Sequence, residues 1–115
     1  MDKLSGLLGI SVRAGQAIFG EDSCMKALRA GQCAALVTDA ALSAAVKEKY
    51  AGVCERANVP MAELPAGMLD AATGKSAMAA AIRKGPLGDS IRKLILAPEN
   101  GDTGLKQGRS PYTKR

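Results

Sequence analysis

The sequence predicts a three-layer α/β/α sandwich with a central four-stranded mixed sheet and about five helices. Apolar residues recur at helical spacing in some segments and form short continuous runs in others. The predicted helices separate the predicted strands, which is typical of a sheet covered on both faces. The chain has 115 residues, which suits one domain, and we place that domain at residues 1–96.

Two helices and a short strand are predicted first. Leucines at helical spacing predict a helix over residues 2–14, which ends at Gly15. Residues 17–19 form a short apolar run that Gly20 breaks, so we expect a strand there. The acidic and capping residues that follow Gly20 predict a second helix over 21–30.

The middle of the chain predicts a buried strand and the most regular helix. Residues 34–38 form a buried strand in this prediction, because they are small or apolar throughout. The helix that ends at Asn58 has one apolar stripe, with Lys47 expected on its solvent side. The stripe consists of Val46, Tyr50, Val53, Cys54 and Ala57.

The last third predicts two strands that alternate with two helices. We expect a strand over 60–64, a short helix over 66–72 and a strand over 77–82. A helix then follows Pro86. The main local alternative is a helix over residues 76–83, because that segment is rich in alanine, the best helix former.

Residues 97–115 have a different character, with Gly and Pro but no periodicity. Four basic residues outweigh two acidic ones, which predicts a flexible basic tail. The tail is either a solvated terminus or a source of weak electrostatic affinity for nucleic acid. The charged residues are Lys106, Arg109, Lys114 and Arg115 against Glu99 and Asp102.

The residues that are absent exclude several functions. Without histidine, the chain can build neither a His-based catalytic site nor a His-containing zinc site. The chain has an odd number of cysteines, Cys24, Cys33 and Cys54, and no two of them have the spacing of a CxxC pair. They predict buried thiols and a reducing, cytoplasmic setting rather than disulfides. We find no signal peptide and no apolar run long enough to span a membrane. We expect no cofactor, no bound metal, no small-molecule substrate and no enzymatic activity.

Two glycine-containing segments are candidate anion sites. Gly74-Lys75-Ser76 has the ending of a phosphate-binding loop, but a helix precedes it and a strand follows, which is the wrong order. The turn at Gly20 is more promising, because the unpaired N–H groups of the next helix point out of it. Lys26 can place its ammonium near the same spot, although a tight turn and a solvated lysine would give the same pattern.

A series of short motifs runs through the chain in a fixed order. They are Arg13-Ala14-Gly15-Gln16, Gly20-Glu21-Asp22, Lys26, Arg29-Ala30-Gly31, Leu36-Val37-Thr38-Asp39, the segment 54–60 and the segment 69–75. With these motifs, residues 13–39 resemble the ribosomal-protein superfamily that binds kink-turn RNA, the L-seven-Ae and L-thirty-e type, and most of all its small bacterial YlxQ-like branch. The resemblance extends over about residues 1–96.

The resemblance implies an α/β/α sandwich that binds structured RNA with two loops. It also implies a ribonucleoprotein setting, with ribosomal RNA as a candidate ligand and ribosomal proteins or translation factors as candidate partners. The implied RNA-binding residues are Gly20, Glu21, Asp22, Ser23 and Lys26 in the first loop and Lys75, Ser76 and Ala77 in the second.

The chain departs from the family pattern at two positions that affect the expected affinity for kink-turn RNA. Strong kink-turn binders of this type carry Asn or Lys, then Glu or Gln, where this chain has Asp22 and Ser23. Asp cannot donate a hydrogen bond and repels phosphate, and Ser is shorter than Glu. Two alternatives remain open: a protein–protein adaptor on the same fold, and a small nucleotide-binding enzyme of flavodoxin-like architecture, against which the missing phosphate loop weighs.

Overall fold

The computed structural model describes residues 3–96, so the predicted basic tail, residues 97–115, lies outside the described residues. None of the helices within 3–96 is both long and apolar enough to cross a bilayer. The elements in chain order are α1 (Lys3–Arg13), β1 (Ala17–Phe19), α2 (Glu21–Arg29), β2 (Cys33–Asp39), α3 (Ala44–Ala57), β3 (Met61–Leu64), α4 (Met68–Thr73), β4 (Ala79–Arg83) and α5 (Pro86–Leu96).

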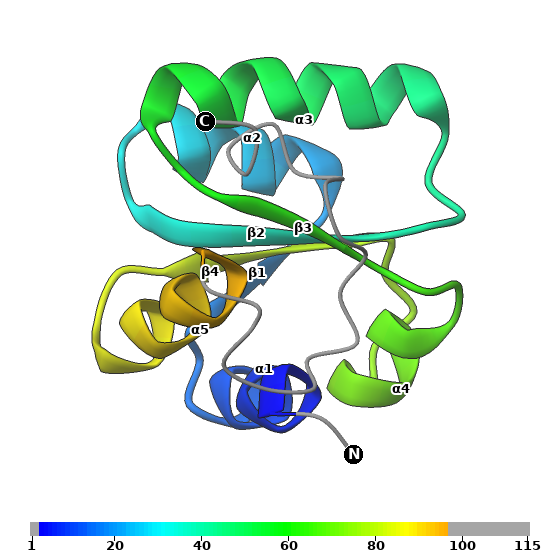
Figure 1. Ribbon diagram of the computed structural model, residues 1–115, viewed down its shortest axis with the longest axis vertical. Coiled ribbons are helices and arrows are strands. Elements are labelled where there is room, and N and C mark those ends of the chain that lie inside the picture. The colour runs from blue at the N-terminus through cyan, green and yellow to red at the C-terminus, as the bar shows by residue number, and fades with distance from the viewer. Residues whose placement is uncertain (1–2, 97–115) are drawn as a thin grey trace.

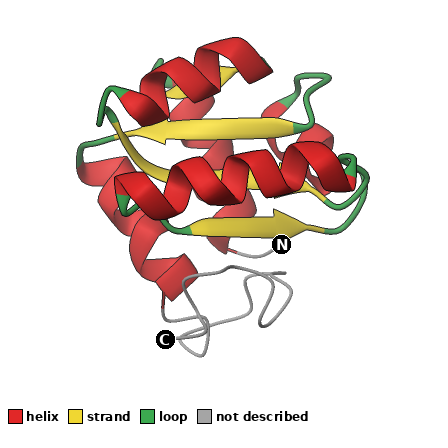
Figure 2. Cartoon of the chain, turned by 90° about the horizontal axis from the view of Figure 1, so that it is seen from above, coloured by secondary structure: helices red, strands yellow, loops and turns green. Residues whose placement is uncertain are grey.

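The four strands form one mixed sheet in the order β1-β4-β2-β3. Strands β2 and β3 are parallel, whereas β4 is antiparallel to both of its neighbours. Helices α2 and α3 cover one face of the sheet and α1, α4 and α5 cover the other (Figure 1, Figure 2). We call these the upper layer and the lower layer. The predicted α/β/α sandwich with a mixed sheet is therefore confirmed.

The alternation of side chains along β2 and β4 divides the interior into two cores. Leu36, Ala79 and Ala81 face the upper layer, and Val37 and Ile82 face the lower one. The alanine-rich segment is thus a strand and not a helix, because its neighbours supply a ladder on both sides and both faces are covered. Tertiary pairing overrides the helix propensity of alanine here.

Two details of the sequence prediction need correction. Strand β4 begins at Ala79 and not at residue 77, because the Ala77 N–H donates to the Asp70 carboxylate and belongs to the preceding loop. Lys47 does not lie on the solvent side of its helix. Its Nζ donates to the Ala40 carbonyl oxygen at 2.8 Å and pairs with the Glu63 carboxylate at 3.3 Å, and its side chain is 27% exposed.

Candidate functional site

The two loops nominated by the sequence meet at one end of the sheet. Strand β1 ends at Phe19, which is paired with Ala80 of β4, and β4 begins one residue earlier at Ala79. Because the two strands are antiparallel, the turn that follows β1 and the loop that precedes β4 emerge side by side. The C-terminal end of β2 lies at the same end, with Thr38 paired to Ala79. We call this the site end.

The first loop is a tight turn into α2. Gly20 has φ of 93°, a conformation that side chains rarely adopt, and it caps α2 without any side-chain hydrogen bond. Glu21 and Asp22 occupy the first turn, where the positive end of the helix dipole favours acidic residues. The Glu21 carboxylate pairs with Lys49 of α3 at 3.1 Å, although both side chains are largely exposed.

The second loop, residues 74–78, is held from three sides. The Ala77 N–H donates to the Asp70 carboxylate at 3.0 Å, and the Lys75 N–H donates to the Thr73 hydroxyl at 3.1 Å. The carbonyl of Met78 accepts from the backbone N–H of Asp39 at 2.9 Å. Anchoring to both α4 and β2 fixes the backbone of this loop relative to the turn at Gly20.

A groove of about 320 Å³ lies between the two loops. Met78 is 40% exposed beside it, whereas Tyr50, which reaches it from α3, is 1% exposed. The groove combines apolar side chains with the backbone of two loops. Its lining consists of Phe19, Gly20, Glu21, Leu42, Val46, Tyr50, Ser76, Ala77, Met78 and Ala79.

The remaining nominated residues lie elsewhere. Asp22 and Lys26 line a second, more open hollow of about 560 Å³ on the α2 surface, together with Arg29 and Lys49. Ser23 and Lys75 are exposed and line neither of these two hollows. The structure therefore brings Gly20, Glu21, Ser76 and Ala77 together around the groove, and it places the cation of Lys26 beside it and not within it.

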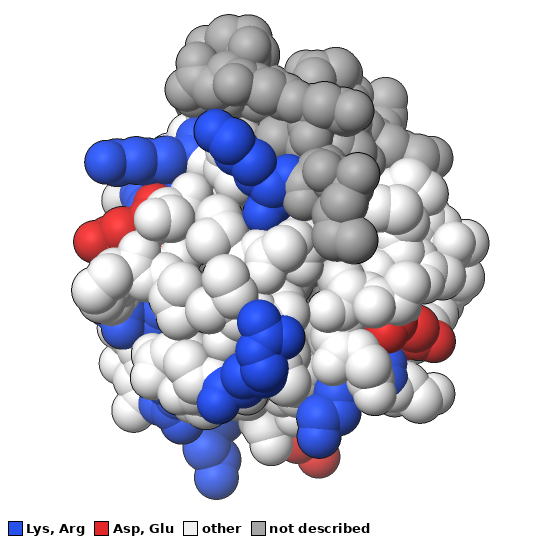
Figure 3. All heavy atoms as spheres, turned by 90° about the horizontal axis from the view of Figure 1, so that it is seen from below, with Lys and Arg blue, Asp and Glu red and all other residues white. Residues whose placement is uncertain are grey.

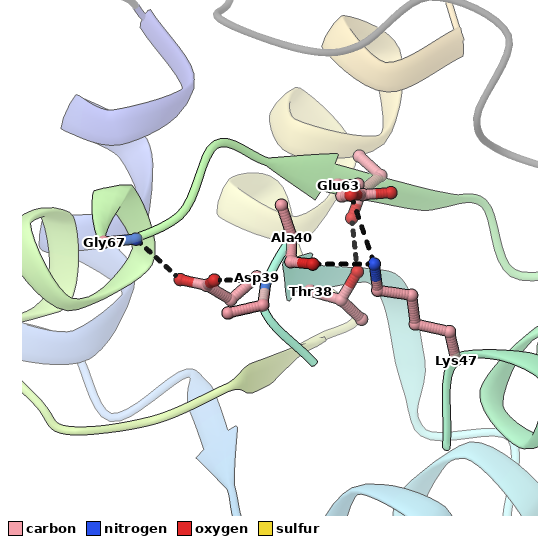
Figure 4. Close-up of polar contacts among 8 residues, drawn as sticks. Thr38, Asp39, Ala40, Lys47, Glu63 and Gly67 are labelled. Atoms are coloured by element: carbon pink, nitrogen blue, oxygen red, sulfur yellow. Dashed lines mark hydrogen bonds and ion pairs between the residues drawn. The ribbon is translucent and has the colours of Figure 1, made fainter. Parts of the chain in front are cut away.

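The carboxylate of Asp39 connects two turns at the site end, and we call this arrangement the carboxylate clamp (Figure 4). Asp39 is buried, and its two carboxylate oxygens accept from the N–H groups of Ala41 at 2.8 Å and Gly67 at 3.0 Å. The clamp joins the loop that follows β2 to the turn that opens α4. Both carboxylate oxygens are thus used in holding these turns, which makes Asp39 a structural residue.

Three thiols and one phenol are buried in the upper core, with Cys33 at the end of β2 opposite the groove. Burial raises the pKa of all three thiols, to about 11 for Cys33 and about 12 for Cys54. Burial is also the main cause of the raised pKa of Tyr50, with contributions from the neighbouring Cys24. The Cys24 thiol donates to the Ile18 carbonyl at 3.2 Å. Neutral, enclosed thiols are poor nucleophiles, and no metal-binding group is found among the described residues.

Sequence reasoning missed the contribution of α3 to this site. Val46 and Tyr50 were assigned only to a core stripe, yet both line the groove. Their role depends on how α3 crosses the sheet next to α2, for which local spacing gives no signal. The sequence analysis places Asp70 and Thr73 in the segment 69–75 that carries the resemblance, but it gives them no role, although they fix the second loop.

No protein-family model matches the chain, and no curated protein sequence matches it either. Its fold is nevertheless similar to that of solved structures. A Bacillus halodurans protein of unknown function superimposes with a TM-score of 0.75 at 25% identity, over 81% of this chain and 96% of that one. The Giardia lamblia 15.5kD RNA binding protein superimposes with a TM-score of 0.68 at 16% identity, over 82% of this chain and 85% of the other. At such low identity the second likeness shows the fold alone.

Proposed function

We propose that the chain is an RNA-binding protein that recognises structured, kink-turn-like RNA at the site end and catalyses no reaction. The observation that carries the proposal is the meeting of the Gly20 turn and the 74–78 loop around one groove. The likeness in fold to an RNA-binding protein supports it. So do the sequence motifs that resemble the kink-turn superfamily and its YlxQ-like branch.

The chemistry of the groove suits a bent RNA. Structured RNA presents splayed bases and closely spaced phosphates, which proteins recognise by apolar contact, backbone hydrogen bonds and cations. The groove offers Met78 and Phe19 for apolar contact and the open N-terminal turn of α2 for hydrogen bonding. Lys26 supplies a cation one turn further along α2. In this proposal, all eight nominated residues flank the RNA.

The proposal also implies where the protein works and which molecules it contacts. The protein works in the cytoplasm, where its buried thiols stay reduced, and it needs no cofactor. Ribosomal RNA is the leading ligand class, and ribosomal proteins or translation factors are the expected neighbours. The competing proposal is a protein–protein adaptor that uses the same fold, which predicts no RNA affinity at all.

The test compares Lys26→Met with Lys93→Met. Both lysines are exposed and lie in the last turn of a helix, and Met keeps the apolar stem while it removes the charge. Lys93 lies on α5, far along the chain from either loop. We expect Lys26→Met to weaken binding of a kink-turn RNA about tenfold, as loss of one charge-assisted hydrogen bond of about 1.5 kcal/mol implies.

Thermal melting of both variants should stay close to that of the unchanged protein, because neither side chain is buried. Equal losses of RNA affinity for both variants would reduce the function to non-specific attraction. Absence of any RNA binding by the unchanged protein, at low and at high salt, would favour the adaptor.

A further inference from the structure

The end of the sheet opposite the site end gathers positive charge. Four backbone and side-chain contacts show that distant segments meet there. The Arg83 N–H donates to the Gln16 carbonyl at 2.9 Å, and the Lys84 N–H donates to the Gln32 carbonyl at 3.0 Å. The Arg92 guanidinium lies 3.3 Å from the carbonyl oxygens of both Ala34 and Asn58.

These contacts bring together the turns that follow α1, α2 and α3, the C-terminal end of β4 and the middle of α5. We call the six basic residues on these segments the basic end. The acidic residues on the same segments are Glu55 and Asp89. The basic end consists of Arg13, Arg29, Arg56, Arg83, Lys84 and Arg92.

The two ends of the sheet differ in charge. The site end carries the acids Glu21, Asp22, Asp39, Glu63 and Asp70, and two of them are paired with lysines. Figure 3 views the face formed by α1, α4 and α5, which is neither end of the sheet, and shows Lys and Arg side chains over that face as well, with Asp and Glu in only a few places.

Helix dipoles account for part of this arrangement. Arg13, Arg29 and Arg56 lie in the last turns of their helices, where a cation is favourable without any ligand. The same reason does not apply to Arg83, Lys84 and Arg92, which lie at a strand end, in a turn and inside a helix. Five of the six residues are exposed, Arg92 being half-buried. The Arg13 guanidinium lies back along α1 beside Gly9 and α4, and the other five cations form a concentrated field at one end of a molecule about 30 Å across.

We propose that the basic end is a second RNA contact, which holds the phosphate backbone without reading sequence. This inference rests on the proposed function, because it takes RNA as the polyanion. The site end would contact the bend of the RNA, while the basic end would contact phosphates of another helix or strand. Arginine suits this task, because its planar guanidinium binds phosphate oxygens with two parallel hydrogen bonds.

The test uses the full chain and two matched double variants. Arg83→Gln with Lys84→Gln removes two exposed charges from the basic end. Lys3→Gln with Lys93→Gln removes two exposed charges that do not belong to the six residues of the basic end. The probes are a kink-turn RNA and an unbent RNA duplex of about 20 base pairs, each titrated at several salt concentrations.

We expect the Arg83/Lys84 double variant to lose about tenfold in affinity for both RNAs. The slope of log affinity against log salt should become shallower by about 2, since each phosphate contact contributes about 0.9. The Lys3/Lys93 double variant should change neither quantity by more than about twofold. A charge-preserving double variant, Arg83→Lys with Lys84→Arg, should bind like the unchanged protein, which separates charge from folding.

Equal losses for the two neutralising double variants would overturn the proposal in favour of net charge alone. Vesicles with and without phosphatidylserine complete the test. If the Arg83/Lys84 change abolishes vesicle binding and leaves RNA binding intact, the basic end is a lipid contact and the proposal is wrong. Lys26→Met separates this inference from the proposed function, since it should weaken binding of the bent RNA while the unbent duplex is unaffected.

Discussion

The two helical layers pack on the same sheet with different chemistry. The upper core contains three thiols, a tyrosine and two methionines among its buried residues. The lower core consists of leucine, isoleucine, valine and alanine. Buried residues of the upper core, Tyr50 and Ala79, line the groove, whereas the lower core contributes only the partly buried Phe19 among the described residues. Changes in the lower core therefore test the fold, whereas changes in the upper core also test the candidate site.

In the lower layer, α5 packs very closely on the sheet. Gly88 of α5 lies against the end of β4, where an added Cβ would overlap the Arg83 carbonyl oxygen and come within 2.9 Å of the Ala34 Cβ. Both neighbours belong to the sheet and cannot rotate away. Because Gly88 has only a hydrogen atom as its side chain, α5 can pack close to β2 and β4.

The largest expected effect is that of Gly88→Ala. We expect it to lower the free energy of unfolding by about 3 kcal/mol, because the helix must move off the sheet and leave the lower core underpacked. Urea denaturation measures the change, with Ser90→Ala on the exposed side of α5 as the control. A urea midpoint within error of the unchanged protein would mean that α5 is not seated against β4 as described.

The upper core should respond to pH, whereas the lower core has no titratable group among its described buried residues. Thiols in the unfolded chain ionise near pH 9.0, but folding raises the pKa of Cys33 to about 11 and that of Cys54 to about 12. Between these values the folded state binds more protons than the unfolded state, so stability falls as pH rises. The stabilising contribution is complete below about pH 9.

At pH 10 the ionisation of each of these two thiols in the unfolded chain should lower the stability by about 1 kcal/mol relative to pH 8. Urea midpoints at pH 8, 9 and 10, measured with a reductant present, give the dependence. Cys33→Ala should remove the share of Cys33 and leave those of Cys54, Cys24 and Tyr50, whose pKa values are also raised, although the variant is less stable at every pH. A midpoint that stays constant from pH 9 to pH 10 would contradict the burial of these thiols.

The sequence was sufficient for the order of elements but not for the contacts between them. The spacing of apolar residues and the positions of turn residues located all nine helices and strands, because the formation of each element depends mainly on residues close to it in the sequence. Lys47 was misplaced because its partner Glu63 lies on β3, which becomes a neighbour only through parallel pairing with β2. Patterns of neighbouring residues in the sequence give no information about such a long-range contact.

The same limit applies to the candidate site. The turn at Gly20 was predicted from its glycine and the acidic residues that follow, and the structure has that turn. The groove, in contrast, depends on the register of β1 against β4 and on where α3 crosses the sheet. The resemblance to a family nominated both loops, and the sheet topology explains why they are adjacent. Whether these residues bind RNA stays a prediction.

A double change in the first turn of α2 should sharpen the site. Asp22→Asn with Ser23→Glu supplies a donor at a base edge and restores the reach of a longer side chain, while the net charge stays the same. We expect affinity for a kink-turn RNA to rise about tenfold, equivalent to one or two added hydrogen bonds. Affinity for an unbent duplex should not change, which serves as the control. An unaltered affinity for the kink-turn would show that this turn does not face the bend.

The smallest expected effect is a gain of stability at α1. Gly6 lies within this helix, and an added Cβ would meet no atom within 4 Å. Gly6→Ala should therefore raise the free energy of unfolding by about 0.5–1 kcal/mol, because alanine loses less backbone entropy in a helix.

Gly9 is the matched comparison on the same helix, since an added Cβ there would lie 3.2 Å from the Ala72 carbonyl of α4. Gly9→Ala gains the same helix propensity but must push α1 away from α4, so its net change should be smaller than that of Gly6→Ala, or negative. Thermal melting of the two variants measures the difference. Equal gains would mean that α1 and α4 are not in close contact. A loss of stability for Gly6→Ala would contradict the open space beside Gly6.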